Sequence, residues 1–216
     1  MPQEPLVLLL VLDYLGTLAF AVSGALKGIR KSMDIFGVTT LAVVTAIGGG
    51  TVRDALLDLR VFWLDDQVYV LLAIVAAIAV FLLYRVVQKT ETALLYFDAV
   101  GLGVFTAIGA MKALQAEAGL VGVVAMACLT GVGGGIIRDL LAGDIPIVLR
   151  AEVYASATIA GALGFWSAQR VGAPLELAIL VAVVITIALR VASILLKWNL
   201  PRHAGALEHP DREDPS

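Results

Sequence analysis

Long apolar runs separated by short polar stretches dominate this chain of 216 residues. The runs hold about 16 to 23 residues, close to the length of a helix that crosses a hydrocarbon layer about 30 Å thick. The pattern therefore predicts an all-α polytopic membrane protein. Seven spans are expected, at residues 6–26, 35–54, 68–84, 94–111, 120–142, 153–168 and 175–197.

The composition supports the membrane class and excludes others. Apolar residues make up 60% of the chain and charged residues 15%, with a mean hydropathy of +0.96, whereas charged residues make up roughly a quarter of a soluble domain. The net charge of −3 says little about partners, and no nucleic-acid partner is expected because the sequence shows no clustered basic face. Cys128 is the only cysteine, which excludes an intramolecular disulfide and a cysteine-based metal cluster.

The sequence contains an internal repeat, whose two copies lie 85 positions apart. Residues 13–54 align with residues 98–139 without a gap and share 15 identities in 42 positions. Apolar composition explains matched valine and alanine, but not matched Asp, Lys, Arg and Phe. The identical pairs are Asp13/Asp98, Gly16/Gly101, Phe20/Phe105, Gly24/Gly109, Ala25/Ala110, Lys27/Lys112, Gly37/Gly122, Val38/Val123, Ala42/Ala127, Thr45/Thr130, Gly48/Gly133, Gly49/Gly134, Gly50/Gly135, Arg53/Arg138 and Asp54/Asp139. Beyond the aligned segments, Tyr69 and Tyr154 are also 85 positions apart, so the alignment continues into the next span.

The repeat is expected to be inverted in the membrane. Three spans separate equivalent positions, and an odd number of crossings makes the second copy enter from the opposite side, as in many transporters. The predicted division is a first three-helix repeat at 1–92, a second, inverted repeat at 93–171, a seventh transmembrane helix at 172–200 and a disordered cytoplasmic tail at 201–216. The architecture is thus 3+3 helices plus one extra helix.

Each copy carries three consecutive glycines near the end of its second span, namely Gly48, Gly49 and Gly50, and Gly133, Gly134 and Gly135. Glycine weakens a helix by about 1 kcal/mol per residue, so each triplet is expected to bend or break its helix. Two breaks near mid-membrane predict a transport path. Close helix packing is the alternative. Thr45 and Thr130 are expected to bond to exposed backbone, to line a wet path or simply to pack between helices.

Two aspartates lie within predicted spans. An ionised side chain at the centre of a membrane costs about 3 kcal/mol or more, so Asp13 and Asp98 need water, the interface or an interior partner. One hypothesis is that they attract cations. The other is that each caps a helix or pairs with an arginine of the other repeat.

An Arg-Asp pair follows each triplet, Arg53 with Asp54 and Arg138 with Asp139. Neighbouring residues on a helix point about 100° apart, so the two members are not expected to bond to each other. Each is expected to reach a different neighbour. The pairs then serve either as a clamp between the repeats or as a charged vestibule that gates or selects.

Three further basic residues lie near the ends of spans. Lys27 and Lys112 are expected to extend to the lipid headgroups, with a gating or lipid contact as the alternative. Arg190, about two turns before the end of the last span, is expected to extend towards the cytoplasmic face in the same way.

Lysine and arginine are unevenly divided between the two sides. Four fall on one side and nine on the other, the nine being Lys27, Arg30, Lys31, Arg85, Lys89, Arg138, Arg150, Lys197 and Arg202. The richer side is expected to be cytoplasmic. The N-terminus is then outside and the C-terminus inside.

The sequence resembles a prokaryotic member of the trimeric intracellular cation channel family. The resemblance rests on seven spans with Gly-Gly-Gly-x-x-Arg-Asp closing the second and fifth, and it covers about residues 13–197. Much the same bacterial sequences are also grouped as glycine transporter domain proteins. The resemblance implies a homotrimer in a prokaryotic cell membrane, with an ion path in each subunit and kinks at residues 48–50 and 133–135.

The leading functional hypothesis is a channel for a monovalent cation, potassium or sodium, lined by the second and fifth helices. The alternative is a secondary transporter for a small zwitterion such as glycine, held by helix ends at the breaks. A third hypothesis is a membrane scaffold that transports nothing, but it gives the paired glycine triplets no function. No enzyme activity, cofactor or metal site is expected, because no catalytic motif occurs and both histidines lie in the polar tail.

Overall fold

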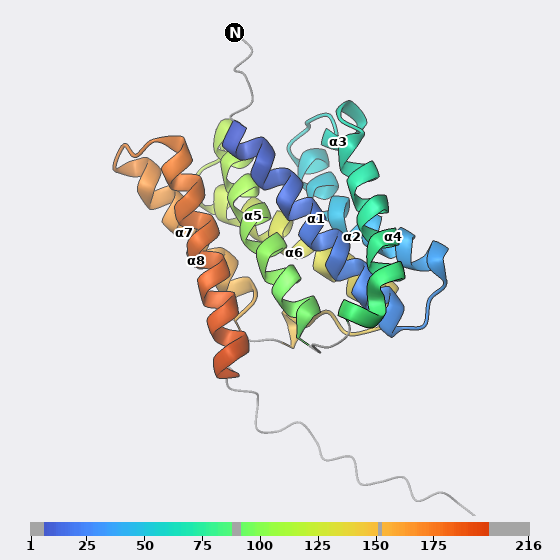
Figure 1. Cartoon of the computed structure of the whole chain (residues 1–216). Helices are drawn as coiled ribbons and strands as arrows, with labels where there is room; N and C mark the ends of the chain where they lie inside the picture. Colours follow the sequence, from blue (N-terminus) through green and yellow to red (C-terminus); the bar gives the residue numbers. More distant parts are fainter. Residues whose placement is uncertain (1–6, 88–91, 151–152, 199–216) are drawn as a thin grey trace, which may run out of the picture.

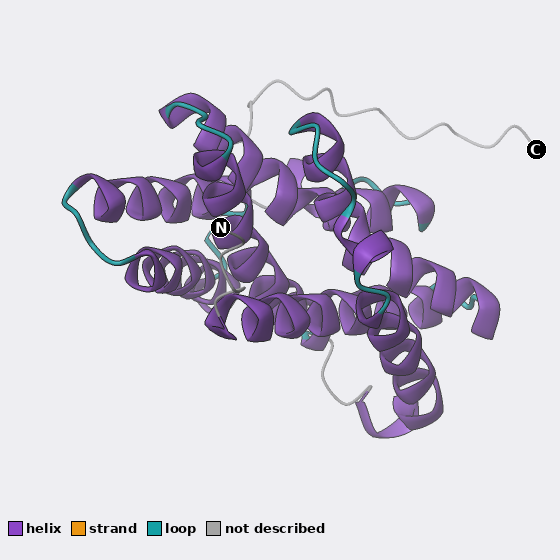
Figure 2. Cartoon of the chain, turned by 90° about the horizontal axis from the view of Figure 1, so that it is seen from above, coloured by secondary structure: helices purple, strands orange, loops and turns teal. Residues whose placement is uncertain are grey.

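The computed structural model describes residues 7–87, 92–150 and 153–198, and this part of the chain is helical without any strand (Figures 1 and 2). In chain order the elements are α1 (Val7–Arg30), α2 (Ile35–Leu56), α3 (Phe62–Asp65), α4 (Val68–Val87), α5 (Ala93–Gln115), α6 (Leu120–Leu141), the 3-10 helix η1 (Ile147–Leu149), α7 (Ala155–Arg170) and α8 (Leu175–Leu196). The predicted tail at 201–216 lies outside the described residues.

Each predicted span coincides with one long helix, so the prediction that the apolar runs form helices is confirmed (Figure 1). Five helices, α1, α2, α5, α6 and α8, are long and apolar enough to cross a membrane. The apolar stretch of α4 is shorter, at Val68–Tyr84, and α7 has 16 residues. A membrane crossing by these two helices stays a prediction.

The turns of the chain repeat at the same interval as the residues. α2 begins after Asp34, whose carboxylate accepts a hydrogen bond of 2.7 Å from a backbone amide three residues later. The turns after α1 and α5 use positive φ at Ser32 (56°) and Glu117 (57°). Those after α2 and α6 use it at Asp58 (54°) and Gly143 (71°). Both pairs are 85 positions apart, so the two copies share backbone shape as well as sequence.

α1 and α5 pack against each other in the middle of the molecule (Figure 1). The buried rings of Phe20 and Phe105 lie with centroids 5.2 Å apart. Gly101 makes room for this contact, because a Cβ there would collide with the Phe20 ring. In α5, 78% of the residues in an apolar stretch of 18 are buried, against 44% or less in the same length of the other four apolar helices. α5 is therefore surrounded by protein rather than by lipid.

The glycine triplets lie where α2 and α6 cross. A Cβ on Gly49 would collide with the carbonyl oxygen of Thr130, and a Cβ on Gly134 would collide with the carbonyl oxygen of Thr45. A Cβ on Gly133 would lie 3.1 Å from the Cα of Gly49. The two backbones therefore touch with no side chain between them, which only glycine permits.

The predicted break at each triplet is wrong. The helix from Ile35 to Leu56 runs through residues 48–50, and the helix from Leu120 to Leu141 runs through residues 133–135. An unwound segment inside a membrane leaves backbone groups without hydrogen bonds, at a cost of several kcal/mol each. This exceeds the weak helical preference of glycine. The alternative, close helix packing, is what the described residues show.

The crossing predicts a large effect of one methyl group. Gly49→Ala is expected to destabilise the protein by about 1–3 kcal/mol, because the added Cβ has no space beside Thr130. The measurement is the melting temperature of the purified protein in detergent. Gly119→Ala is the matched control, since nothing lies within 4 Å of a Cβ at Gly119. Equal melting temperatures for the two variants would contradict the close contact.

Candidate functional site

Two clusters, each of four charged residues and one tyrosine, lie at opposite ends of the central helices. The upper cluster, at the α3 end in Figure 1, consists of Asp13, Arg53, Asp54, Tyr69 and Lys112. The lower cluster consists of the residues 85 positions away, Asp98, Arg138, Asp139, Tyr154 and Lys27. On α1, 14 residues separate Asp13 from Lys27, a rise of about 21 Å. Each cluster therefore lies near one face of the molecule.

In the upper cluster one buried carboxylate holds two cations. Asp54 Oδ1 lies 2.7 Å from Arg53 Nη2 and 3.3 Å from Lys112 Nζ. Asp54 Oδ2 accepts a hydrogen bond of 3.0 Å from the Phe62 backbone amide. The Phe62 ring lies against the Arg53 guanidinium, 5.6 Å from centroid to Cζ. The short helix α3 thus covers the end of α2.

The lower cluster repeats this geometry. Asp139 Oδ1 lies 3.0 Å from Arg138 Nε and 3.4 Å from Lys27 Nζ. Asp139 Oδ2 accepts a hydrogen bond of 2.9 Å from the backbone amide of Ile147 in η1, the position equivalent to Phe62. Each lysine pairs with an aspartate of the other sequence copy. The two lysines therefore tie α1 to α6 and α5 to α2.

The expectation that neighbouring Arg and Asp do not bond to each other is wrong. Their Cβ directions diverge, but the long arginine side chain reaches back to the carboxylate, with Arg53 Nε 2.8 Å from Asp54 Oδ1. Burial favours this contact, because an unpaired charge away from water costs several kcal/mol. The second part of the prediction is confirmed, since Asp54 and Asp139 also reach the lysines of the other copy.

Lys27 and Lys112 were expected to extend to the lipid headgroups, and this is wrong. Their side chains are 15% and 23% exposed, and both ammonium groups turn inward to the buried carboxylates. The buried carboxylates attract the ammonium groups strongly, because the protein interior screens the attraction between opposite charges less than water does.

The two aspartates within the spans have different partners. Asp98 is fully buried and pairs with Arg138 Nη1 at 2.5 Å, and the same nitrogen donates a hydrogen bond of 2.6 Å to Ser23. The predicted partner was an arginine of the other repeat, but Arg138 belongs to the same copy, on the adjacent helix. Asp13 is half-buried and accepts a hydrogen bond of 2.9 Å from Tyr69. Asp13 lines one of the described pockets, the one beside the upper cluster.

A pocket of about 340 Å³ opens beside the upper cluster. Its acidic lining residues are Asp13, Asp65 and Asp66, its basic ones are Arg60 and Lys112, and the others are Leu9, Leu10, Phe62 and Tyr69. The Tyr14 hydroxyl donates a hydrogen bond of 2.6 Å to Asp66 and so fixes one wall. Acidic side chains outnumber basic ones in this lining, so the pocket favours cations over anions from solution.

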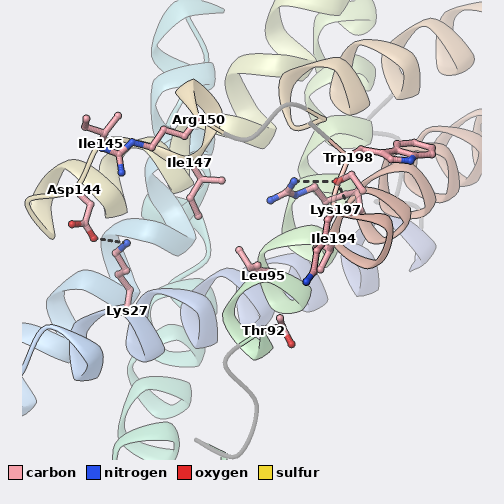
Figure 3. A pocket seen from close by; sticks show the side chains of 12 residues that line it. Lys27, Thr92, Leu95, Asp144, Ile145, Ile147, Arg150, Ile194, Lys197 and Trp198 are labelled. Atoms are coloured by element: carbon pink, nitrogen blue, oxygen red, sulfur yellow. Dashed lines mark hydrogen bonds and ion pairs between the residues drawn. The ribbon is translucent and has the colours of Figure 1, made fainter. Parts of the chain in front are cut away.

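A second pocket, of about 620 Å³, opens beside the lower cluster (Figure 3). Its charged lining residues are Lys27, Arg150, Arg190, Lys197 and Asp144. Asp144 lies in the loop after α6 and bonds to Lys27 Nζ at 2.7 Å and to Lys31 Nζ at 2.6 Å. Hydrogen bonds from these two lysines, first Lys27 and then Lys31, lower the pKa of Asp144 to about 2. Its carboxylate is therefore ionised at physiological pH.

Arg190 of α8 was expected to extend towards the cytoplasmic face, and this is also wrong. It is 4% exposed, its Cζ lies 4.8 Å from the centroid of the Tyr154 ring, and its Nη1 donates a hydrogen bond of 3.3 Å to Ser193. No signal in the sequence marked this contact, because α8 has no counterpart in the repeat. The register did align Tyr69 with Tyr154, which could have drawn both into the site.

Thr45 and Thr130 are fully buried at the helix crossing. Each hydroxyl donates a hydrogen bond of 2.6 Å to a carbonyl one turn earlier in its own helix, that of Leu41 or Met126. Their own carbonyl oxygens face the opposite glycine triplet. Among the described residues, no group of three or more His, Cys, Asp or Glu could hold a metal ion.

Comparison with known proteins gives consistent matches along the chain. Residues 10–85, and again residues 95–170, match the family model described as glycine transporter. The inner membrane protein YadS of Escherichia coli K12 is 44% identical over 204 residues, which cover 93% of this chain and 98% of that protein. The membrane protein YvgT of Bacillus subtilis 168 is 37% identical over 204 residues, which cover 92% and 98%.

Solved structures match over nearly the same length. The trimeric intracellular cation channel orthologue of Rhodobacter sphaeroides gives a TM-score of 0.85 at 40% identity, covering 89% of this chain and all of that one. A prokaryotic channel of the same kind, crystallised in 0.5 M KCl, gives 0.84 at 34% identity, covering 90% and 99%. With its apolar helices and membrane-protein relatives, the chain is a multi-pass membrane protein.

The buried ion pairs predict a strong dependence of stability on Asp54. Asp54→Asn is expected to destabilise the protein by about 3–5 kcal/mol, because Arg53 and Lys112 lose the carboxylate that they share. Asp65→Asn is the control and is expected to cost less than about 1 kcal/mol, since the Arg60–Asp65 pair is 72% and 52% exposed. Melting temperatures in detergent measure both. Similar losses would show that burial of the cluster contributes little.

Proposed function

Because the chain belongs to the family of prokaryotic trimeric intracellular cation channels, which is also described as the glycine transporter family, we propose that it is a channel for monovalent cations, including potassium. The observation that carries the proposal is the pairing of one pocket with one charge cluster at each end of the α2–α6 crossing. The solved relatives named as cation channels support it.

We infer that the two copies form an inverted repeat. Equivalent contacts recur 85 positions apart at opposite ends of α1 and α5, including Lys112 with Asp54 and Lys27 with Asp139. Such an exchange is what a two-fold axis in the membrane plane produces. The three-helix units are α1, α2 and α4, and α5, α6 and α7, with α8 as the extra helix.

The proposed ion path runs inside each subunit, from the upper pocket past the α2–α6 crossing to the lower pocket. At the crossing the backbones leave no room for a methyl group beside Gly49 or Gly134, so this arrangement is closed to ions. Conduction requires the two helices to separate. The carbonyl oxygens of Thr45 and Thr130 then line the opening and replace part of the water around a cation.

Charge favours cations at the upper pocket, whereas the lower pocket is lined mainly by basic residues and supplies no such preference. Asp54 and Asp139 neutralise the arginines and lysines beside them, so the clusters present no unpaired basic barrier between the helices. Asp13 faces the upper pocket and raises the local cation concentration there. Asp98 acts indirectly, by holding Arg138.

Two further features belong to the proposal. The lower face is cytoplasmic, because the basic loops gather there, so the C-terminus is inside and the N-terminus outside. The protein assembles as a homotrimer in a prokaryotic inner membrane, since a relative of solved structure is named a trimeric channel and the Escherichia coli relative an inner membrane protein.

The reversal potential tests the channel directly. Purified protein in planar bilayers, under a tenfold gradient of KCl, is expected to give single-channel currents that reverse near the potassium equilibrium potential. Asp13→Asn is expected to lower the conductance at low salt and to have little effect at 1 M salt, where the Debye length falls to about 3 Å. Glu176→Gln, an equal change of charge outside the described pockets, is the control. Currents that reverse near the chloride potential would contradict the proposal.

Glycine transport is the second candidate, favoured by the description of the matched family and by the upper pocket. Asp13 and Lys112 both line that pocket and could hold the two charges of a zwitterion. Counterflow in proteoliposomes separates the candidates. A carrier concentrates labelled glycine against unlabelled glycine in a saturable way, whereas the proposed channel gives no counterflow.

A further inference from the structure

The lower end of the molecule carries an ionic connection that the upper end lacks. Asp144 bridges Lys27 at the end of α1 and Lys31 in the following turn, with N–O distances of 2.7 and 2.6 Å. Figure 3 shows the Lys27–Asp144 contact at the side of the lower pocket. The bridge joins residues 113 positions apart, one in each half of the repeat.

The equivalent positions in the upper half cannot form this bridge. Leu59 lies 85 positions before Asp144, and Ala116 lies 85 positions after Lys31. The surrounding contacts do match, since the Leu59 amide bonds to the Asp54 carbonyl at 2.8 Å and the Asp144 amide bonds to the Asp139 carbonyl at 2.9 Å. The two loops therefore make the same backbone hydrogen bond, but the residue that makes it is Asp144 in the lower loop and Leu59 in the upper loop.

The bridge is mechanically linked to the lower cluster. The backbone bond to Asp139 holds Asp144 next to α6, while the Lys31 amide bonds to the Lys27 carbonyl at 3.1 Å at the end of α1. Lys27 itself reaches both Asp139 and Asp144. Movement of the end of α6 and its loop away from α1 must therefore break four N–O contacts, three made by Lys27 and Lys31 and one between Arg138 and Ser23. Among the described residues, the equivalent movement at the upper end breaks the contact between Lys112 and Asp54.

We propose that Asp144 is a positioning residue whose ion pairs with Lys27 and Lys31 form a latch that holds the ends of α1 and α6 together, so that the lower end of the α2–α6 crossing is harder to open than the upper end. This inference rests on the proposed channel function. The latch acts through charge and is partly exposed, with 37% of the Lys31 side chain and 34% of the Asp144 side chain accessible. Salt therefore weakens it. The lowered pKa of Asp144 keeps it intact over the physiological pH range.

The expected size of the effect follows from partly exposed ion pairs. Such a pair changes an equilibrium by about two- to fivefold. Asp144→Asn is therefore expected to raise the ratio of open to closed time of single channels by about two- to tenfold. Lys31→Gln is expected to give part of this increase, and the double variant is expected to match Asp144→Asn alone, because both changes remove one connection.

Salt dependence distinguishes a latch from a general loss of stability. In the original protein the ratio of open to closed time is expected to rise when ionic strength is increased with an impermeant salt, and Asp144→Asn is expected to flatten this rise. Glu176→Gln, which removes a carboxylate at the start of α8, is the control and should leave the ratio unchanged. An unchanged ratio in Asp144→Asn, or an equal rise in Glu176→Gln, overturns the latch.

A labelling experiment tests the latch without any current. Thr45 is fully buried at the α2–α6 crossing, and Cys128 is the only native cysteine. In a Cys128→Ser, Thr45→Cys background, a membrane-impermeant thiol reagent is expected to react about two- to fivefold faster when Asp144→Asn is added. Equal rates overturn the latch. If rates differ but the original protein carries no cation current, the channel proposal fails and the latch stands as a closure of the crossing.

Discussion

The need to pair buried charge governs this structure. Arg53, Asp54, Arg138 and Asp139 lie among apolar helices with almost no exposure, where an unpaired ion is costly. The helices satisfy these charges with Lys112 and Lys27, each supplied by the other sequence copy. Neither copy can neutralise its own cluster completely, so the charged residues hold the two copies in register at both ends. This explains why the motif contains Asp as well as Arg.

The glycine triplets and the charge clusters act on the same pair of helices. Glycine lets the backbones of α2 and α6 touch in their C-terminal halves, and the ion pairs fix the helix ends about one turn further on. Backbone contact of this kind has little side-chain interlocking, so it can separate without repacking a core. A closed but separable crossing between two water-accessible pockets is a suitable constriction for small cations.

The sequence predicted the helices, the 85-residue interval and the charged positions, because apolar periodicity and identity are direct signals. It could not predict that the triplets pack instead of breaking, since glycine favours both outcomes and only the position of the opposite backbone decides between them. The inward turns of Lys27 and Arg190 depend on partners far away in the chain, Asp139 and Tyr154. Asp144 was missed because its counterpart, Leu59, breaks the repeat.

The central claim is that cations pass within each subunit, between the two charge clusters. Crystals grown with thallium or rubidium in place of potassium test it most directly, because anomalous scattering locates each ion. The account predicts ions in the upper pocket beside Asp13 and, in an open state, at the carbonyl oxygens of Thr45 and Thr130. Ions found only along a route outside the α2–α6 crossing, such as an axis between subunits, would contradict it.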